Sequence, residues 1–227
     1  MLVEQALSQD FTIGNLKYTI TDFENHKVSV GKADTNPTGE LVIESTVEDD
    51  GIIYTVTSVR AQAFSDCWKL TSVTIPNSVV SIGSGAFYGC SMLESMTLPF
   101  VGAQKYSATY LYNQFPLGYL FGTVYYSGSV ATTQTYYGGN SNSLTNTQYY
   151  IPSSLKNITI TDCSYIAYGT FNNCGNLISV LIPNTVSGIG GSAFNGCSKL
   201  TTVTIPNSVT SIGESHCRNM GRLSFHS

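Results

Sequence analysis

Alternating apolar and polar residues organise this chain, and the clearest stretch is LTSVTIPNSVVSIGSGAFYGC, which begins at Leu70. The chain repeats it at Leu177 as LISVLIPNTVSGIGGSAFNGC and starts it again at Leu200. Leu93 and Leu200 each lie 23 residues after the first leucine of the preceding unit. A period of this length indicates a repeat protein, in which each unit is one supersecondary structure and neighbouring units share a core.

Within one unit, the first apolar positions alternate with polar ones. Val73 and Ile75 flank Thr74, and this two-residue period is typical of a β-strand. Pro76 follows directly and ends the strand, because proline has no backbone N–H to donate to a sheet. Each unit therefore predicts one short strand followed by a turn.

The second half of the unit leads the chain to the next strand. Gly83 predicts a sharp or left-handed turn, and Ala86 and Phe87 with Cys90 predict a single helical turn. No unit can bury these side chains alone, so we expect the units to stack and their strands to pair in parallel, about 4.8 Å apart. Stacking predicts two structural ladders, one of Phe64, Phe87, Phe171 and Phe194 and one of Cys67, Cys90, Cys174 and Cys197.

The shared pattern of the units, L-x-x-V-x-I-P-x-x-V-x-x-I-G-x-x-A-F-x-x-C, resembles the leucine-rich repeat of the BspA type. That family is named for a bacterial cell-surface antigen and is found in gut and oral bacteria and in some protozoan parasites. The resemblance is specific over residues 70–90 and 177–197, looser over 155–174 and partial at both ends. It implies a solenoid from a surface protein, with host-matrix or cell–cell contacts in some relatives.

We therefore expect an α/β or mainly β fold: a leucine-rich repeat solenoid over residues 41–227 with short parallel strands and a β-rich N-terminal cap over residues 1–40. In the cap, FTIGNLKYTI and HKVSV alternate as strands do, and TDFEN connects them. The dipeptide Asp50-Gly51 predicts a tight hairpin. Arg60 stands where the repeat has glycine, so the backbone turn there is expected to differ.

The repeat is interrupted by a tyrosine-rich insertion at about residues 101–150, which holds ten of the fifteen tyrosines. Because a structureless loop of this length is unusual, we expect a partly ordered excursion that lies against the solenoid, with flexible tips at 127–135 and 138–147. Six tyrosines in three adjacent pairs are the candidate ligand-binding residues: Tyr125, Tyr126, Tyr136, Tyr137, Tyr149 and Tyr150.

Two interpretations of these tyrosines remain open. Tyrosine concentrates at recognition surfaces, because it combines a large apolar area with a hydroxyl group and loses little rotamer entropy on binding. Alternatively, the rings pack the insertion onto the solenoid and need no ligand. In an extended backbone each pair places one ring on each face, so one ring of each pair is available to face outward.

Composition and charge narrow the function. The net charge is −4, and residues 1–50 hold ten of the fourteen acidic residues against three lysines. The solenoid lacks a basic stripe, which argues against nucleic acid as a partner. No apolar run approaches the length of a membrane span, and MLVEQALSQDF lacks the pattern of a secretion signal. The low charge and the family resemblance favour a fragment or mature form of a longer surface protein over a cytosolic protein.

The sequence does not predict a catalytic or metal site. Four of the six cysteines recur at one repeat position and are expected to be buried thiols, with disulfides between rungs as the alternative. The sequence contains no Cys-x-x-Cys pair, which would have suggested a zinc site, and no cofactor is expected. His26, His216 and His226 are far apart in repeat space, and His216 and Cys217 stand where the repeat has Ala-Phe, so the last unit is expected to be truncated or altered.

The sequence therefore predicts a non-enzymatic binding or adhesion module of a cell-surface or secreted bacterial protein. Its partner is expected to be a protein or glycan, for example from the host matrix or a neighbouring cell. The alternative is a structural spacer with no ligand of its own. A solenoid offers an extended, rigid surface in both cases, and the repeat alone does not identify a ligand.

Overall fold

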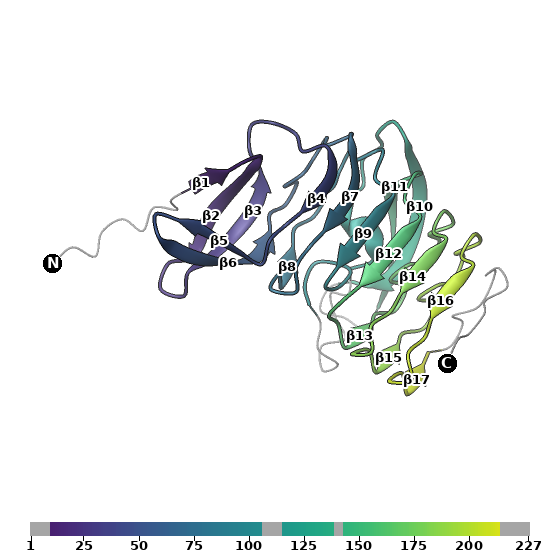
Figure 1. Cartoon of the computed structure of the whole chain (residues 1–227). Helices are drawn as coiled ribbons and strands as arrows, with labels where there is room; N and C mark the ends of the chain where they lie inside the picture. The colour runs from purple at the N-terminus through teal and green to yellow at the C-terminus, as the bar shows by residue number, and fades with distance from the viewer. Residues whose placement is uncertain (1–9, 106–114, 139–142, 214–227) are drawn as a thin grey trace.

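The computed structural model describes residues 10–105, 115–138 and 143–213 of the chain. The fold is mainly β: the described residues form strands and one short 3₁₀ helix, and they contain no α-helix. Figure 1 shows an N-terminal sheet followed by a solenoid whose strands stack side by side toward the C-terminal end. None of the helical structure in the described ranges is long and apolar enough to cross a membrane.

The N-terminal sheet is mixed and has the strand order β1-β2-β3-β6-β5. Its strands are β1 (Asp10–Ile13), β2 (Leu16–Asp22), β3 (Lys27–Lys32), β5 (Thr46–Asp49) and β6 (Ile52–Val59). The β5–β6 hairpin turns at Asp50 and Gly51, which have φ of 48° and 79°, so the Asp-Gly prediction is confirmed. Strand β8 (Ser81–Ile82) pairs in parallel with β6 and joins this sheet to the solenoid.

The solenoid is built on a six-stranded parallel sheet of order β16-β14-β12-β9-β7-β4. Its strands are β4 (Gly39–Val42), β7 (Leu70–Thr74), β9 (Ser95–Leu98), β12 (Asn157–Ile160), β14 (Ser179–Leu181) and β16 (Thr202–Thr204). A second parallel sheet stacks β13 (Tyr165–Ile166), β15 (Gly188–Ile189) and β17 (Ser211–Ile212). The predicted solenoid with short parallel strands is confirmed.

The turn after Gly83 differs from the prediction in two ways. Residues 84–89 form successive turns and not a helical turn, because Gly85 and Gly89 have positive φ, of 61° and 74°. The carbonyl of Ala86 accepts a hydrogen bond from the N–H of Phe64 on the preceding rung, at 2.8 Å. Gly83 itself is not among the residues with positive φ. It is required because a Cβ there would lie 2.1 Å from the backbone nitrogen of Ala61.

Phenylalanine rings and buried cysteine thiols of neighbouring rungs contact one another along the core. Phe64 and Phe87 stack with ring centroids 5.5 Å apart, and Phe171 and Phe194 stack at 5.3 Å. Each ladder cysteine is also buried, and the thiols of Cys90 and Cys197 donate to the carbonyls of Phe64 and Phe171 at 3.2 and 3.1 Å. The core therefore continues from rung to rung along the solenoid.

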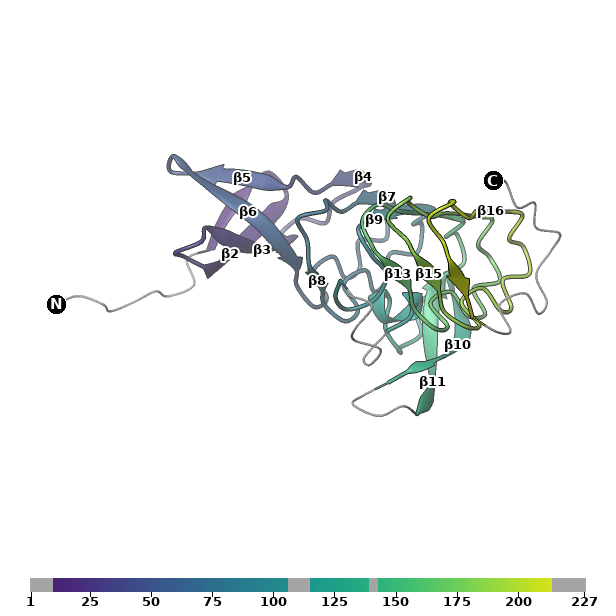
Figure 2. The same ribbon diagram turned by 90° about the horizontal axis from the view of Figure 1, so that it is seen from below.

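The insertion contains a short 3₁₀ helix, η1 (Leu117–Leu120), and an antiparallel hairpin of β10 (Ser129–Tyr137) and β11 (Leu144–Pro152). The prediction of flexible tips at 127–135 and 138–147 was wrong for most of the described residues in these ranges, because they belong to these two strands. Figure 2 shows the hairpin extending from one side of the solenoid.

Part of the insertion completes a rung. The N–H groups of Gly85 and Phe87 donate to the carbonyls of Tyr119 and Leu120, at 2.9 Å each, and on the other side the N–H of Leu117 donates to the carbonyl of Thr170. The 3₁₀ segment therefore occupies the place of the repeat turn between two regular rungs. Strands β9 and β12 pair directly across the insertion.

Candidate binding surface

The hairpin is held against the solenoid by a buried glutamine. Gln134, which has no exposed surface, accepts a hydrogen bond from the N–H of Gly118 at 2.7 Å. Its side-chain amide donates to the carbonyl of Asn172 at 2.9 Å and lies 3.3 Å from the thiol sulfur of Cys174. One side chain thereby links the 3₁₀ segment, the hairpin and a repeat turn, and its polar atoms are all paired, as burial requires.

The free edge of β10 is also fixed by the repeat. The backbone N–H of Thr135 donates to the side-chain oxygen of Asn172, and the side-chain amide of Asn173 donates to the carbonyl of Thr133 at 2.7 Å. Gly169 approaches so closely that a Cβ there would lie 1.8 Å from the carbonyl oxygen of Thr135. These contacts make the hairpin a rigid element.

Three of the six predicted ligand-binding tyrosines are buried by this packing. Tyr126, Tyr136 and Tyr149 are 8%, 6% and 4% exposed, and Tyr126 packs against Tyr88 of the repeat, with ring centroids 5.2 Å apart. Burial raises the pKa of the Tyr126 and Tyr149 hydroxyls far above the usual value of tyrosine. The three buried rings support the packing interpretation at these positions.

Of their sequence neighbours, Tyr125 is exposed, and Tyr137 and Tyr150 are half-buried. Tyr125 is 65% exposed, and its ring meets that of Tyr150 edge-on at 5.8 Å. Tyr137 is half-buried against Tyr168, at 5.1 Å between ring centroids. In each pair one ring is therefore buried and its neighbour is more exposed, as the alternation of an extended backbone favours.

The outward face of the hairpin is uncharged. Its cross-strand pairs are Ala131 with Tyr150, Thr133 with Gln148, Thr135 with Asn146 and Tyr137 with Leu144. Amide and hydroxyl groups thus occupy the centre, and an aromatic ring lies at each end. Such a mixture of aromatic and neutral polar side chains is typical of protein recognition surfaces.

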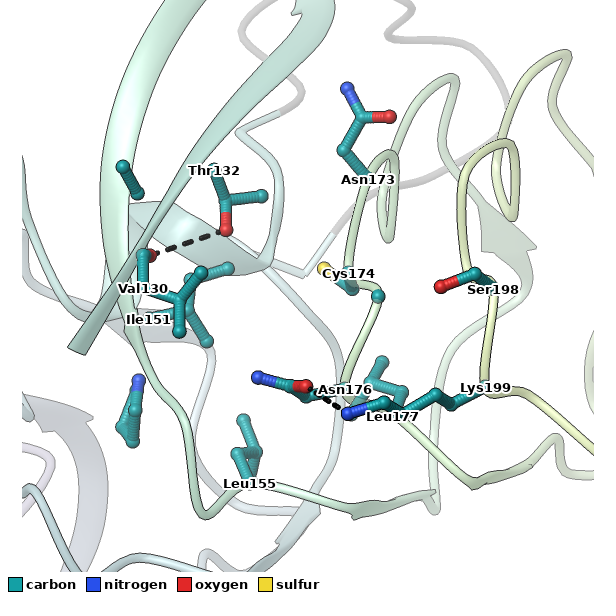
Figure 3. A pocket seen from close by; sticks show the side chains of 13 residues that line it. Val130, Thr132, Ile151, Leu155, Asn173, Cys174, Asn176, Leu177, Ser198 and Lys199 are labelled. Atoms are coloured by element: carbon teal, nitrogen blue, oxygen red, sulfur yellow. Dashed lines mark hydrogen bonds between the residues drawn. The ribbon is translucent and has the colours of Figure 1, made fainter. Parts of the chain in front are cut away.

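A groove lies at the base of the hairpin, between β10–β11 and the turns of the last described rungs (Figure 3). Its volume is about 250 Å³. Val130, Ile151 and Leu177 supply apolar walls, and Asn176 and Lys199 lie at the turns, where the ammonium of Lys199 donates to the Asn176 side-chain oxygen at 2.9 Å. Among the described lining residues, only Lys199 carries a charge.

The described cysteine thiols are unreactive because they are buried. Cys67, Cys90, Cys163, Cys174 and Cys197 are all buried and free of disulfides, so the alternative of bonds between these rungs is wrong. Burial raises the pKa of Cys67 to about 11 and the pKa values of Cys163 and Cys197 to about 12. Such groups remain protonated at neutral pH and are poor nucleophiles.

The other candidate catalytic or metal-binding side chains do not form a cluster in the described part of the chain. His26 lies in the cap beside Tyr54, at 5.8 Å between ring centroids, whereas His216, Cys217 and His226 lie outside the described residues. The described part of the chain holds no group of three or more histidine, cysteine or acidic side chains arranged to bind a metal ion.

The chain belongs to the family of the BspA type leucine-rich repeat region, because residues 50–118 and 123–226 match it in six copies. The match includes the 3₁₀ segment through residue 118 and resumes just before the hairpin. The predicted family is therefore confirmed. No curated protein matches the chain.

Solved structures of bacterial leucine-rich repeat proteins are similar to it. PcpA, described as a pneumococcal vaccine antigen, has a TM-score of 0.50 at 18% identity over 96% of this chain and 49% of its own. A leucine-rich cell surface protein of Faecalibacterium prausnitzii has a TM-score of 0.46 at 23% identity, over 95% of this chain and 54% of its own. A leucine-rich repeat protein of Bacteroides ovatus has a TM-score of 0.44 at 27% identity, over 95% and 41%. This chain spans about half the length of these proteins, and PcpA supports the fold alone.

Sequence reasoning identified the tyrosine pairs but missed the residues that orient them. Gln134, Asn172 and Asn173 carry no pattern that distinguishes them from surface amides, and the groove residues Asn176 and Lys199 occupy variable repeat positions. One usable signal was present: alternation along TTQTYY places Gln134 on the same strand face as Tyr136.

Proposed function

We propose that this chain is a non-enzymatic adhesion module of a bacterial cell-surface or secreted protein, and that it recognises a protein ligand through the hairpin and the groove at its base. The observation that carries the proposal is the exposed ring of Tyr125, which lies beside the half-buried ring of Tyr150 on a hairpin whose inner face is bonded to the solenoid. Binding residues on a rigid element lose little conformational freedom when a ligand arrives, so more of the contact energy becomes affinity.

The groove supports a protein ligand in particular. Its apolar walls and its size suit one apolar side chain of a partner, and the neutral side chain of Asn176 lies where it can bond to the partner's backbone. Tyrosines on the adjacent face would supply the aromatic contacts that dominate many protein interfaces. The cell-surface location rests on the family and on the low charge of the solenoid.

A structural spacer is the rival function, and the outer face of the six-stranded sheet favours it. In register along that sheet lie Thr74, Thr97, Thr159, Leu181 and Thr204. Three of these strands place a serine two residues earlier, at Ser72, Ser95 and Ser179, which gives a neutral, hydroxyl-rich surface with no aromatic anchor. A spacer would use only the length and rigidity of the stack.

The test is binding of the whole chain to an array of extracellular-matrix proteins and glycans, measured by surface plasmon resonance. Tyr125→Ala and Tyr150→Ala are expected to weaken binding about tenfold each, because aromatic anchors at an interface are worth more than about 1 kcal/mol. Phe23→Ala is the matched control, since Phe23 is an exposed ring, 59% exposed, in the N-terminal cap.

Unchanged binding in both tyrosine variants would place recognition away from the tyrosines, in the groove or on the solenoid sheet. Binding to none of the array would favour the spacer. Binding to glycans alone, with the same loss in the tyrosine variants, would keep the hairpin as the site but replace the protein ligand.

A further inference from the structure

Trp68 is the single tryptophan of the chain, and its side chain is 53% exposed. It lies on the turn just before β7, one residue after the ladder cysteine Cys67. The corresponding residues after Cys90, Cys174 and Cys197 are Ser91, Gly175 and Ser198. The solenoid therefore does not require a large ring at this repeat position.

The ring of Trp68 borders a hollow of about 210 Å³, which is also lined by Asn36, Pro37, Thr38 and Lys69. The ammonium of Lys69 lies 4.7 Å from the indole centroid, where it interacts with the ring face. The hollow is thus bounded by an aromatic plane, a proline ring, a hydroxyl group and a cation.

Hydrogen bonds fix the walls of this hollow. The N–H of Gly39 donates to the carbonyl of Lys69 at 2.9 Å, and the side-chain amide of Asn36 donates to the carbonyl of Asp66 at 2.9 Å. The ammonium of Lys32 donates to the Asn36 side-chain oxygen, also at 2.9 Å. The loop 36–38 is therefore tied to the turn that carries Trp68, and the hollow is preformed.

The lining specifies the chemistry of a ligand. A pyranose ring presents a face of C–H groups, which packs on the electron-rich face of an indole, and hydroxyl groups at its rim, which bond to donors such as Lys69 and Thr38. The volume lies below the range of about 300 to 1,000 Å³ that is typical of drug-sized ligands, so it suits one ring. A proline-rich peptide is less suitable, because such peptides use grooves lined by several aromatic residues, and the described lining has one.

The acidic residues near the hollow favour a neutral sugar over an anionic one. Asp34, Glu40 and Asp66 are exposed close to this turn in the sequence, against Lys32 and Lys69 at the hollow, so acidic side chains outnumber basic ones around it. An anionic ligand approaching the hollow would meet this negative field. We propose that Trp68 is the platform of a second binding site, which takes a sugar ring of a neutral glycan.

This site is independent of the protein-binding function proposed for the hairpin. In the main sheet, β7 is separated from β14 by β9 and β12, so the turn of Trp68 and the groove lie on different rungs. Two such sites would let one module contact a glycan and a protein together, which raises the effective affinity of both contacts.

The test is a fluorescence titration of the whole chain. Because Trp68 is the only tryptophan, emission excited at wavelengths that tyrosine does not absorb reports this position alone. The probes are cello-, malto-, xylo- and mannohexaose, with oligogalacturonate as the anionic probe and a proline-rich peptide as the third class. We expect at least one neutral hexaose to change the emission in a saturable way, with a Kd of about 1 mM.

Variants make the assignment specific. Lys69→Ala and Thr38→Ala keep the reporter and are expected to weaken binding about threefold to tenfold, the effect of one lost hydrogen bond. Trp68→Ser, which restores the residue of two other rungs, is expected to abolish binding in calorimetry while the circular dichroism spectrum stays unchanged. Tyr125→Ala is the control for an exposed ring elsewhere and is expected to leave the titration unchanged.

Three outcomes would overturn the proposal: no change in emission with any neutral hexaose, a response confined to oligogalacturonate or to the peptide, or unaltered binding in both Lys69→Ala and Thr38→Ala. If Trp68→Ser does not fold, these last two variants decide the question.

Discussion

At the scale of single residues, the buried hydroxyl of Tyr126 is a weak point of the structure. It is the one buried side-chain nitrogen or oxygen in the described chain without a hydrogen-bond partner. The hydroxyl of Tyr136, in contrast, lies 3.2 Å from the hydroxyl of Thr147 and accepts a hydrogen bond from Tyr149 at 3.3 Å. Two buried tyrosines of the insertion therefore have opposite energetic roles.

We predict that Tyr126→Phe raises the free energy of unfolding by about 1 kcal/mol, because a buried polar atom without a partner costs about 1–3 kcal/mol. Tyr136→Phe is the matched control and is expected to lower it by about 1 kcal/mol, since its partners lose a bond. Urea unfolding of both variants measures the difference. A loss of stability in Tyr126→Phe would show that its hydroxyl has a partner.

The buried thiols make stability depend on alkaline pH. Their pKa values are raised in the folded state, so the folded chain keeps protons that the unfolded chain releases above its ordinary thiol pKa of about 8.5. We expect the unfolding free energy to be steady from pH 7 to about 8.5 and then to fall toward the folded pKa values of about 11 to 12 of Cys67, Cys163 and Cys197.

The check is urea unfolding at several pH values up to 10. Cys197→Ala is expected to be less stable at every pH but to have a shallower alkaline slope, by up to about 1.4 kcal/mol per pH unit, because one proton fewer is linked to folding. Equal slopes in the two proteins would contradict a buried, protonated thiol at this position.

At the scale of elements, the hairpin β10–β11 shows how a surface feature is positioned. Alternation in TTQTYY and in the tyrosine pairs is visible in the sequence and indicates strands, yet abundant Ser, Thr, Gly and Asn favoured flexible tips. The strands form because Gln134, Asn172 and Gly169 anchor them to a repeat turn. These contacts join residues 34 to 38 positions apart and do not recur from one repeat to the next. A periodic pattern in the sequence therefore cannot predict them.

Gln134→Leu, which keeps volume but removes both polar groups, is expected to destabilise the chain by about 2–4 kcal/mol, because the N–H of Gly118 and the carbonyl of Asn172 are left buried without this partner. Gln148→Leu, at an exposed position of β11, is the control and should change stability by less than about 0.5 kcal/mol. Amide hydrogen exchange of the hairpin locates the effect. Unchanged protection in β10 would contradict the role assigned to Gln134.

At the scale of the whole molecule, the insertion is part of the solenoid core. Leu117, Leu120 and Phe121 are fully buried, and the 3₁₀ segment bonds to the rungs on both sides. The stack is therefore continuous through a region where the repeat pattern is interrupted in the sequence. A solenoid transmits stability through contacts between neighbouring rungs, so the loss of one rung divides the molecule.

Replacing residues 103–149 by a Gly-Ser linker is expected to abolish cooperative folding, since each large buried side chain lost costs about 2–5 kcal/mol. The control joins Tyr137 to Leu144 by Asn-Gly, because these residues are the last pair of the hairpin and a two-residue turn can connect them. The control should shift Tm by less than about 3 °C. Thermal unfolding checks both, and a cooperative transition in the first variant would show that the insertion is dispensable.

The sequence by itself determined the repeat, the strand positions and the outward alternation of the tyrosine pairs, because each depends on contacts that recur at a fixed spacing. The need for glycine at Gly83 was also visible, but its cause, the approach of Ala61, was not. Tertiary structure alone decided which ring of each tyrosine pair is buried, how Gln134 locks the hairpin, and where the groove and the hollow beside Trp68 lie. These features depend on non-periodic contacts between distant segments, and such contacts exist only once the rungs have stacked.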